Sequence, residues 1–214
     1  MCIMIYCPNA QQFPVASVPD FFRANHDGIG AMFADGGKVH TAKALPLKSA
    51  DATAFCKGAM ARAGKGPMVI HFRFATHGSV SLANTHPFTV RSDLALMHNG
   101  VLGIDTADGE TDTVAYIDQY LRPIIGKVRN PIALLNGPLG EIIGAHIAGS
   151  KFALMDSKGK VALVNEGDGH WVSGVWYSNL HWRPWVRAAA KHTKRGSTLD
   201  DARENWDYWG RVYG

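Results

Sequence analysis

Residues that could attack and hold an amide substrate are concentrated at the amino terminus and between positions 71 and 112. Cys2 follows the initiator methionine, and Met1 is normally removed when so small a residue follows it. Cys2 would then carry a thiol and an α-amine on one carbon. The amine titrates near 7.7 to 8.0 and the thiol near 8.5, so the amine can take the thiol proton near neutral pH. Cys2 is therefore a candidate nucleophile with its own base, although a cysteine that opens a strand can equally be a small buried hydrophobe.

Four further residues could supply the other groups of an acyl-transfer site. Arg73 has a planar fork of donors that suits a carboxylate, and Asn99 with Gly100 places a side-chain amide beside an unhindered backbone N–H, a pair suited to an oxyanion. Asp112 could accept a substrate ammonium. Each has a structural alternative: a surface salt bridge for Arg73, a tight turn for Asn99-Gly100 and a helix-stabilising acid for Asp112.

The histidines and cysteines predict no metal site. His71, His77, His86 and His98 match neither a His-x-x-x-His helix nor a Cys/His finger. The three cysteines, Cys2, Cys7 and Cys56, have neither zinc-ligand spacing nor a disulfide framework, which is typical of a reducing compartment. We therefore expect a cytoplasmic protein with no metal and no cofactor.

The length and charge of the chain indicate a single-domain globular protein. A chain of 214 residues with 46% hydrophobic content fits one domain with a sizeable core. The first residues lack a secretion signal, and no apolar run reaches the roughly 20 residues of a membrane-spanning helix. The net charge of +4 is modest, so we expect no membrane association and do not expect nucleic-acid binding.

Periodicity and turn residues indicate layered helices and strands. Strands are predicted at 3–6, at 30–34 and 38–42 around Asp35-Gly36-Gly37, at 67–74 and at 94–98. Ser49 is predicted to cap a helix through Arg62, ended by Gly64, and Thr111 to cap one that buries Val114, Ile117 and Leu121. Arg73 then lies at a strand end, and Asn99-Gly100 follows a strand.

The last third of the chain predicts a hairpin and a helical extension. Strands at 151–156 and 161–166 flank a turn, and 170–177 reads as one further strand. From Arg183 onward we expect a basic helix, a stop at Gly196 and a helix with an aromatic stripe. These patterns predict a domain over residues 2–180 and a basic, aromatic extension over residues 181–214, which either docks a partner or packs on its own domain.

Taken in order, these motifs resemble those of one enzyme family. Cys2, Arg73-x-Ala75-Thr76-His77-Gly78, Asn84-x-His86-Pro87, Asn99-Gly100 and Thr111-Asp112-Thr113 resemble a class II glutamine amidotransferase domain of the N-terminal nucleophile hydrolase superfamily, and Asn25–Gly30 resembles its Asp-Gly-Trp-Gly segment. The resemblance implies an α+β fold, a four-layer α/β/β/α sandwich, and glutamine hydrolysis through a thioester on Cys2.

The resemblance also implies a role for each site residue. Arg73 would hold the substrate α-carboxylate and Asp112 its α-amine, while Asn99 and Gly100 would form the oxyanion hole. The pocket would be lined by Thr76 and His77, with His86 as a pocket-wall or structural residue.

Departures from the family pattern leave the substrate open. Ile3, Ile29 and Phe74 stand where many members have Gly, Trp and Trp, respectively. The first interpretation is a glutaminase that supplies ammonia to a separate synthetase or ligase, since the length leaves no room for a second domain. The alternatives are a hydrolase of another γ-glutamyl amide and a non-catalytic binding protein with the same sandwich.

Overall fold

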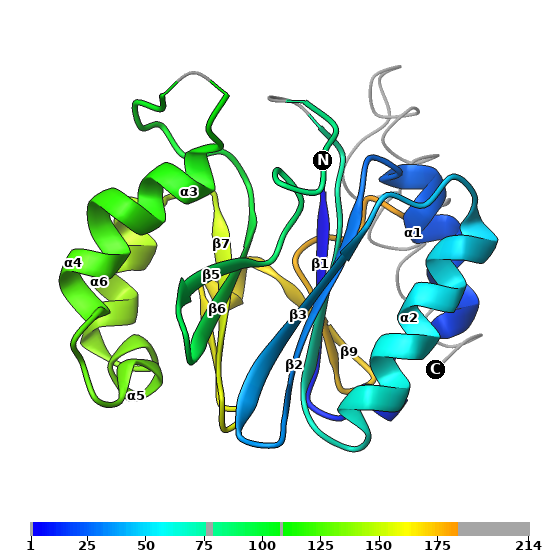
Figure 1. Cartoon of the computed structure of the whole chain (residues 1–214), viewed down its shortest axis with the longest axis horizontal. Helices are drawn as coiled ribbons and strands as arrows, with labels where there is room; N and C mark the ends of the chain where they lie inside the picture. The colour runs from blue at the N-terminus through cyan, green and yellow to red at the C-terminus, as the bar shows by residue number, and fades with distance from the viewer. Residues whose placement is uncertain (1, 76–78, 108, 184–214) are drawn as a thin grey trace, which may run out of the picture.

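The computed structural model describes residues 2–75, 79–107 and 109–183, and its two antiparallel sheets face one another (Figure 1). In this part of the chain the larger sheet has six strands, in the order β3-β2-β4-β1-β10-β9, and the smaller has four, in the order β5-β6-β7-β8. The strands are β1 (Ile3–Cys7), β2 (Ile29–Asp35), β3 (Lys38–Ala44), β4 (Met68–Phe72), β5 (Phe88–Arg91), β6 (Leu94–Asn99), β7 (Lys151–Asp156), β8 (Val161–Val164), β9 (His170–Val172) and β10 (Val175–Tyr177).

Helices cover the outer face of each sheet. On the six-stranded sheet lie α1 (Val18–Ala24) and α2 (Ser49–Ala63). On the four-stranded sheet lie α3 (Asp112–Tyr116), which continues through a π-helical turn (Ile117–Leu121) into α4 (Arg122–Ile125), then α5 (Pro131–Leu135) and α6 (Pro138–His146). Short 3₁₀ turns occupy Ala10–Gln12, Val15–Ser17 and Glu166–Asp168. The predicted α+β class and four-layer α/β/β/α sandwich are confirmed.

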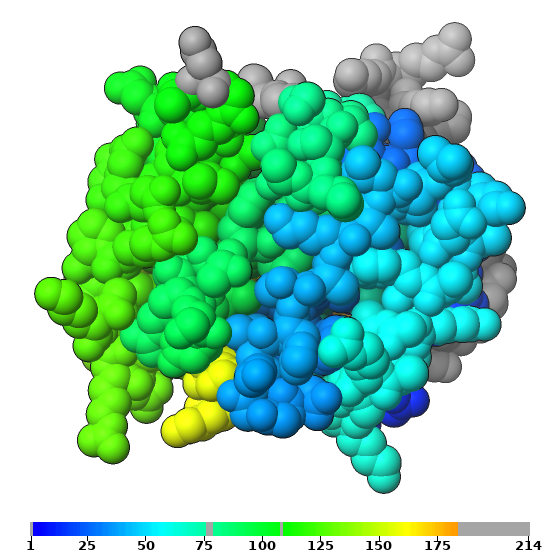
Figure 2. All heavy atoms as spheres, viewed as in Figure 1, coloured from blue at the N-terminus to red at the C-terminus, as the bar shows by residue number. Residues whose placement is uncertain are grey.

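Strand alternation builds three separate apolar layers. In β1, Ile3 and Ile5 face the helices, whereas Met4 faces the opposite sheet and packs in one cluster with Met97 of β6 and Trp176 of β10. In β6, Leu94 and Leu96 face the helices. Because successive side chains of a strand point to opposite faces, His98 continues the helix-facing row and Asn99 the inter-sheet row. On the face shown in Figure 2, the β2–β3 hairpin lies between the two helical layers.

Most of the predicted strands are confirmed, with small shifts of their ends. The β2–β3 turn uses Gly36 and Gly37 at φ of 55° and 75°, which explains the glycine pair. Arg73 follows directly after β4. Thr111 is the N-cap of α3, where its hydroxyl accepts a hydrogen bond from Val114 N at 3.3 Å. Among the described residues, no helix combines the length and apolarity needed to cross a membrane.

Two local predictions are wrong. The single strand expected over 170–177 is instead β9 and β10, paired around Ser173 and Gly174, which have φ of 50° and 77°. Ser49 does not cap α2: it is the first helical residue, Lys48 is the N-cap, and Asp51 Oδ2 accepts from Lys48 N at 3.2 Å.

The structure can be compared with the carboxyl-terminal predictions only as far as Arg183. The two helices expected beyond Arg183 fall in 184–214, outside the described residues. Core packing continues to Trp182, whose ring lies 4.4 Å from that of Phe21. The division at residue 180 stays a prediction.

Candidate active site

A cavity of about 250 Å³ lies where β1 begins and where β4 and β6 end. This is the end of the sandwich at which the amino terminus lies in Figure 1. The cavity is lined by Cys2, Arg73, Phe74, Ala75, Asn84, His86, His98, Gly100, Val101, Leu102, Ile104, Thr106, Glu110, Thr111, Asp112 and Thr113. Residues predicted from five separate stretches of sequence, Cys2, Arg73, His86, Gly100 and Asp112, therefore meet around one space.

The Cys2 thiol is held against the segment that follows β4. Its sulfur accepts a hydrogen bond from Phe74 N at 3.2 Å and lies 3.4 Å from Phe74 O. Burial raises the pKa of the thiol, and the Phe74 backbone, the amino-terminal charge and Arg73 oppose this shift. A base must therefore take the thiol proton when the sulfur attacks. The segment itself is fixed by Asp27, whose Oδ2 accepts from Ala75 N at 2.8 Å.

The Cys2 carbonyl is held by two asparagines. Asn99 Nδ2 donates to it at 3.1 Å, and Asn179 Nδ2 donates at 2.7 Å. The Asn99 amide also donates to Ser178 Oγ, which accepts from Met4 N at 2.9 Å. In this structure the Asn99 amide is thus engaged by the protein, while Gly100 lines the cavity.

Ser178 and Asn179 were not foreseen from the sequence. They follow β10, whose antiparallel pairing with β1 brings Asn179 beside Cys2 across 177 positions of sequence. Neither residue belongs to a motif, so only the pairing of the two strands could have revealed them.

Arg73 provides a buried cation at the cavity wall. Its residue is 5% exposed, and Nη1 donates to Ser79 O at 3.1 Å. Asn84, also in the wall, donates from Nδ2 to the same carbonyl at 3.2 Å. The contact with Ser79 restrains the Arg73 guanidinium. The guanidinium of an exposed arginine would lack this restraint.

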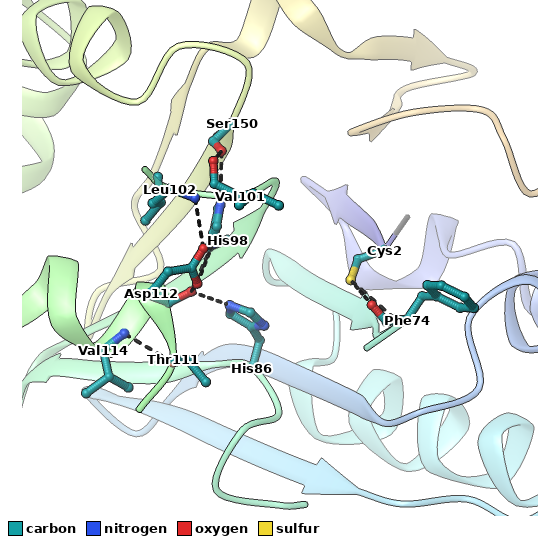
Figure 3. Close-up of polar contacts among 11 residues, drawn as sticks. Cys2, Phe74, His86, His98, Val101, Leu102, Thr111, Asp112, Val114 and Ser150 are labelled. Carbon is teal, nitrogen blue, oxygen red and sulfur yellow. Dashed lines mark hydrogen bonds and ion pairs between the residues drawn. The ribbon is translucent and has the colours of Figure 1, made fainter. Parts of the chain in front are cut away.

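Asp112 lies on the wall opposite Cys2 (Figure 3). It is the first residue of α3, and its Oδ2 accepts from Leu102 N at 2.8 Å. The carboxylate therefore faces the cavity from a helix start, where a negative charge is also favoured. A thiol flanked by one fixed cation and one fixed anion matches an amino acid that carries both charges.

Of the remaining predicted pocket residues, His86 is in place. Its Nε2 lies 3.3 Å from Thr113 Oγ1, its ring is 4.5 Å from that of His71, and burial lowers its pKa well below the usual value. Thr76 and His77 lie outside the described residues. Among the side chains that the structure describes, no group of three or more His, Cys, Asp or Glu residues is placed to hold a metal.

Sequence comparison with known proteins gives two glutamine–fructose-6-phosphate aminotransferases as relatives. No protein-family model matches the chain. It is 28% identical over 168 residues, 70% of its length, to glutamine–fructose-6-phosphate aminotransferase (isomerizing) of Caulobacter vibrioides, and 24% identical over 93 residues, 35% of its length, to the enzyme of that name from Idiomarina loihiensis. These alignments cover 27% and 15% of the two relatives, so the chain matches about a quarter of their length or less.

Solved structures give weaker likenesses. Glutamine phosphoribosylpyrophosphate amidotransferase from B. subtilis has 17% identity and a TM-score of 0.46, covering 83% of this chain and 41% of that one. A predicted glutamine amidotransferase from Pseudomonas aeruginosa PA01 has 21% identity and a TM-score of 0.36, covering 72% and 65%. The aligned sequences agree with the family that the motif order resembles: the chain is similar to two glutamine–fructose-6-phosphate aminotransferases.

Proposed function

We propose that the chain hydrolyses the side-chain amide of glutamine, with Cys2 as nucleophile. The observation that carries the proposal is that Cys2, Arg73 and Asp112 line one cavity, with the cation and the anion fixed by separate contacts. Arg73 would bind the α-carboxylate of glutamine, and Asp112 its α-ammonium. Those two anchors direct the amide carbon toward the thiol.

The chemistry needs one base that accepts and returns a proton. After removal of Met1, the α-amine of Cys2 takes the thiol proton as sulfur attacks the amide carbon and the carbonyl electrons move to oxygen. The intermediate then collapses, its C–N bond breaks, and the α-ammonium gives that proton to the departing ammonia. Water attacks the thioester while the α-amine accepts a proton from it. The C–S bond then breaks, glutamate leaves, and the α-ammonium returns the proton to the Cys2 sulfur.

We assign stabilisation of the oxyanion to Gly100 N–H and to the Asn99 amide. Gly100 has φ of 148° and lies in the cavity wall. Asn99 would exchange its bond to the Cys2 carbonyl for one to the oxyanion, so that this donor is engaged before and during the reaction. Each such donor is typically worth about 2.7–4 kcal/mol in the transition state.

We further propose that the released ammonia passes to a separate acceptor enzyme in the cytoplasm. Only 27% of the Caulobacter aminotransferase is aligned, so the fructose-6-phosphate in that relative's name is not assigned to this chain as an acceptor. The cavity also extends along Ile104, Thr106 and Glu110, which leaves another γ-glutamyl amide as an alternative substrate.

The experiment is to measure glutamate and ammonia released from glutamine, and glutamate released from γ-glutamyl methylamide and γ-glutamyl anilides. Wild-type protein should prefer glutamine, and Cys2→Ala should fall to background while keeping its fold by circular dichroism. Preference for a substituted amide would identify the alternative hydrolase. No turnover of any of them would favour a non-catalytic protein, and full activity of Cys2→Ala would refute the mechanism.

A further inference from the structure

One buried imidazole joins two walls of the cavity. His98 is 3% exposed, and its ring is placed between two hydroxyl groups: Nδ1 lies 2.8 Å from Thr113 Oγ1 and Nε2 lies 3.2 Å from Ser150 Oγ. Thr113 Oγ1 lies 3.2 Å from Asp112 Oδ1, and Ser150 Oγ lies 3.0 Å from Val101 O. Figure 3 shows His98, Asp112 and Ser150 together, on the side opposite Cys2.

Strand geometry explains why His98 serves this wall and not the nucleophile. Its neighbour Asn99 points between the sheets toward Cys2, and His98 points the other way, toward α3 and β7, where it also packs against Phe152. The two residues are adjacent in sequence, but they act on opposite sides of the four-stranded sheet.

Counting protons leaves two arrangements for His98: Nδ1–H donates to Thr113 and Thr113 to Asp112, or Nε2–H donates to Ser150 and Ser150 to Val101 O. Burial lowers the pKa of His98 more than the adjacent Asp112 raises it, so the ring is neutral near pH 7 and has one N–H. The other titratable or charged groups that face this region are His71 of β4, His86 and Arg73. Thr113 has one hydroxyl proton, and a carboxylate is the strongest acceptor near it. The charged carboxylate favours the first arrangement, in which Thr113 accepts from His98 Nδ1–H and Ser150 donates to Nε2, because the second ends on the neutral Val101 carbonyl.

We propose that His98, as the Nδ1–H tautomer, is a positioning residue that fixes the Asp112 carboxylate through Thr113 for the substrate α-ammonium. This inference rests on the proposed function, because Asp112 binds the ammonium only if the substrate is an amino acid. Leu102 N holds one carboxylate oxygen at 2.8 Å, and the Thr113 hydroxyl holds the other. The carboxylate is therefore restrained at both oxygens, and selectivity for an α-ammonium depends on the imidazole behind it.

Two substitutions of His98 separate its two contacts. The amide of Asn can lie where Nδ1 lies and donate to Thr113, whereas the longer Gln reaches the Nε2 position and Ser150. His98→Gln should raise KM for glutamine at least tenfold, with kcat within about threefold of wild type, and His98→Asn should restore most of the affinity. Thr113→Val should reproduce the effect of His98→Gln, with Thr113→Ser as its conservative control.

A substrate without the α-ammonium distinguishes positioning from general damage. Glutaramate has the same side-chain amide and carboxylate as glutamine but no amine, so its KM should change less than twofold in His98→Gln and Thr113→Val. The proposal is overturned if KM rises equally for both substrates, if the Asn and Gln variants behave alike, or if kcat falls while KM stays constant.

An NMR measurement tests the contact independently of turnover. In protein labelled with ¹⁵N-histidine, long-range ¹H–¹⁵N spectra at pH 7 should show His98 protonated at Nδ1, with the signal assigned by its loss in His98→Asn. Protonation at Nε2 overturns the proposal. If the wild type does not hydrolyse glutamine, the proposed function fails, and the NMR result still decides whether His98 donates to Thr113.

Discussion

At the residue scale, the contacts around Cys2 separate into those that hold its backbone and those that would hold a substrate. Asn99 and Asn179 donate to the Cys2 carbonyl, whereas Arg73 and Asp112 face the cavity. The nucleophile therefore has a fixed backbone before any ligand binds. Fixed geometry of this kind lowers the entropic cost of bringing the thiol to the amide.

The Asn179 contact can be removed without disturbing its neighbour. Asn179→Asp keeps the oxygen that accepts from His181 N at 3.1 Å and replaces the donor to the Cys2 carbonyl by a repelling oxygen. We expect kcat for glutamine to fall about 100-fold with little change in KM, because the nucleophile and not the binding groups is displaced. Asn136→Asp, which removes a similar surface contact to Val161 O, is the control in steady-state assays. An unchanged kcat in Asn179→Asp would rule out an anchoring role.

Arg73 offers a second prediction at this scale. Arg73→Lys keeps the charge and removes the planar fork, so KM for glutamine should rise about 10- to 100-fold. 4-Aminobutanamide retains the amine and the side-chain amide of glutamine but lacks the α-carboxylate, so its turnover should hardly change. Equal losses for the two substrates would contradict the assignment of Arg73 to the carboxylate.

At the scale of elements, the end of β6 sets the geometry of the site. Strand alternation sends His98 and Asn99 to opposite layers, and Gly100 then turns the chain along Ser150. A Cβ built on Gly100 would lie 2.1 Å from Ser150 Oγ and 2.7 Å from Ser150 Cα. The close approach and the φ of 148° both require glycine here.

Gly100→Ala should therefore disturb both stability and catalysis. We expect a loss of about 1–3 kcal/mol in the free energy of unfolding from the strained backbone, and more than a tenfold drop in kcat. Gly103→Ala is the matched control, because a Cβ at Gly103 meets no atom within 4 Å. Urea unfolding and glutaminase assays measure the two effects. Near-wild-type behaviour of Gly100→Ala would show that the close packing against Ser150 is not required.

Residue patterns within a single strand or turn predict that strand or turn well. The pairing of strands that are far apart in the sequence cannot be predicted from such patterns. Alternating apolar residues give β1 and β6, and the glycine pair gives the β2–β3 turn. Ser173 has a positive φ although it is not a glycine, so its residue type does not mark the β9–β10 turn and the sequence predicts one strand there. Arg73 and Asp112 can be identified as candidates from their local motifs. The position of Asn179 beside Cys2 depends on the β1–β10 register, which no local motif gives. Helices α1, α5 and α6 and the short strand β5 were not predicted.

At the scale of the whole molecule, three histidines of the described residues, His71, His86 and His98, lie in the interior near the cavity. His71 is fully buried, and neither of its ring nitrogens has a hydrogen-bond partner among the described residues. Burial and the nearby His98 and Arg73 charges lower the pKa of His71 to about 3. The folded protein therefore favours a neutral His71 ring, and acid lowers the free energy of unfolding because the unfolded chain binds the proton more readily.

This burial predicts a specific loss of stability in acid. The unfolded chain protonates His71 below about pH 6.5, whereas the folded chain does so only near pH 3, so the stabilisation is complete above 6.5 and declines as pH falls toward 3. The contribution of His71 is about 1.4 kcal/mol per pH unit in that window. His71→Phe should reduce the slope of unfolding free energy between pH 6.5 and 5, measured in urea, relative to wild type and to the surface variant His26→Phe. An identical slope in all three proteins would refute this origin of acid sensitivity.

The central claim is that Cys2 is the nucleophile of a glutamine pocket, and intact-protein mass spectrometry tests it most directly. Untagged protein is weighed before and after incubation with 6-diazo-5-oxonorleucine, with and without glutamine, alongside Cys2→Ala. We predict loss of Met1 and a single adduct that maps to Cys2, is suppressed by glutamine and is absent from Cys2→Ala. Removal of Met1 with no adduct, or an adduct at Cys7 or Cys56 that glutamine does not suppress, would contradict the account.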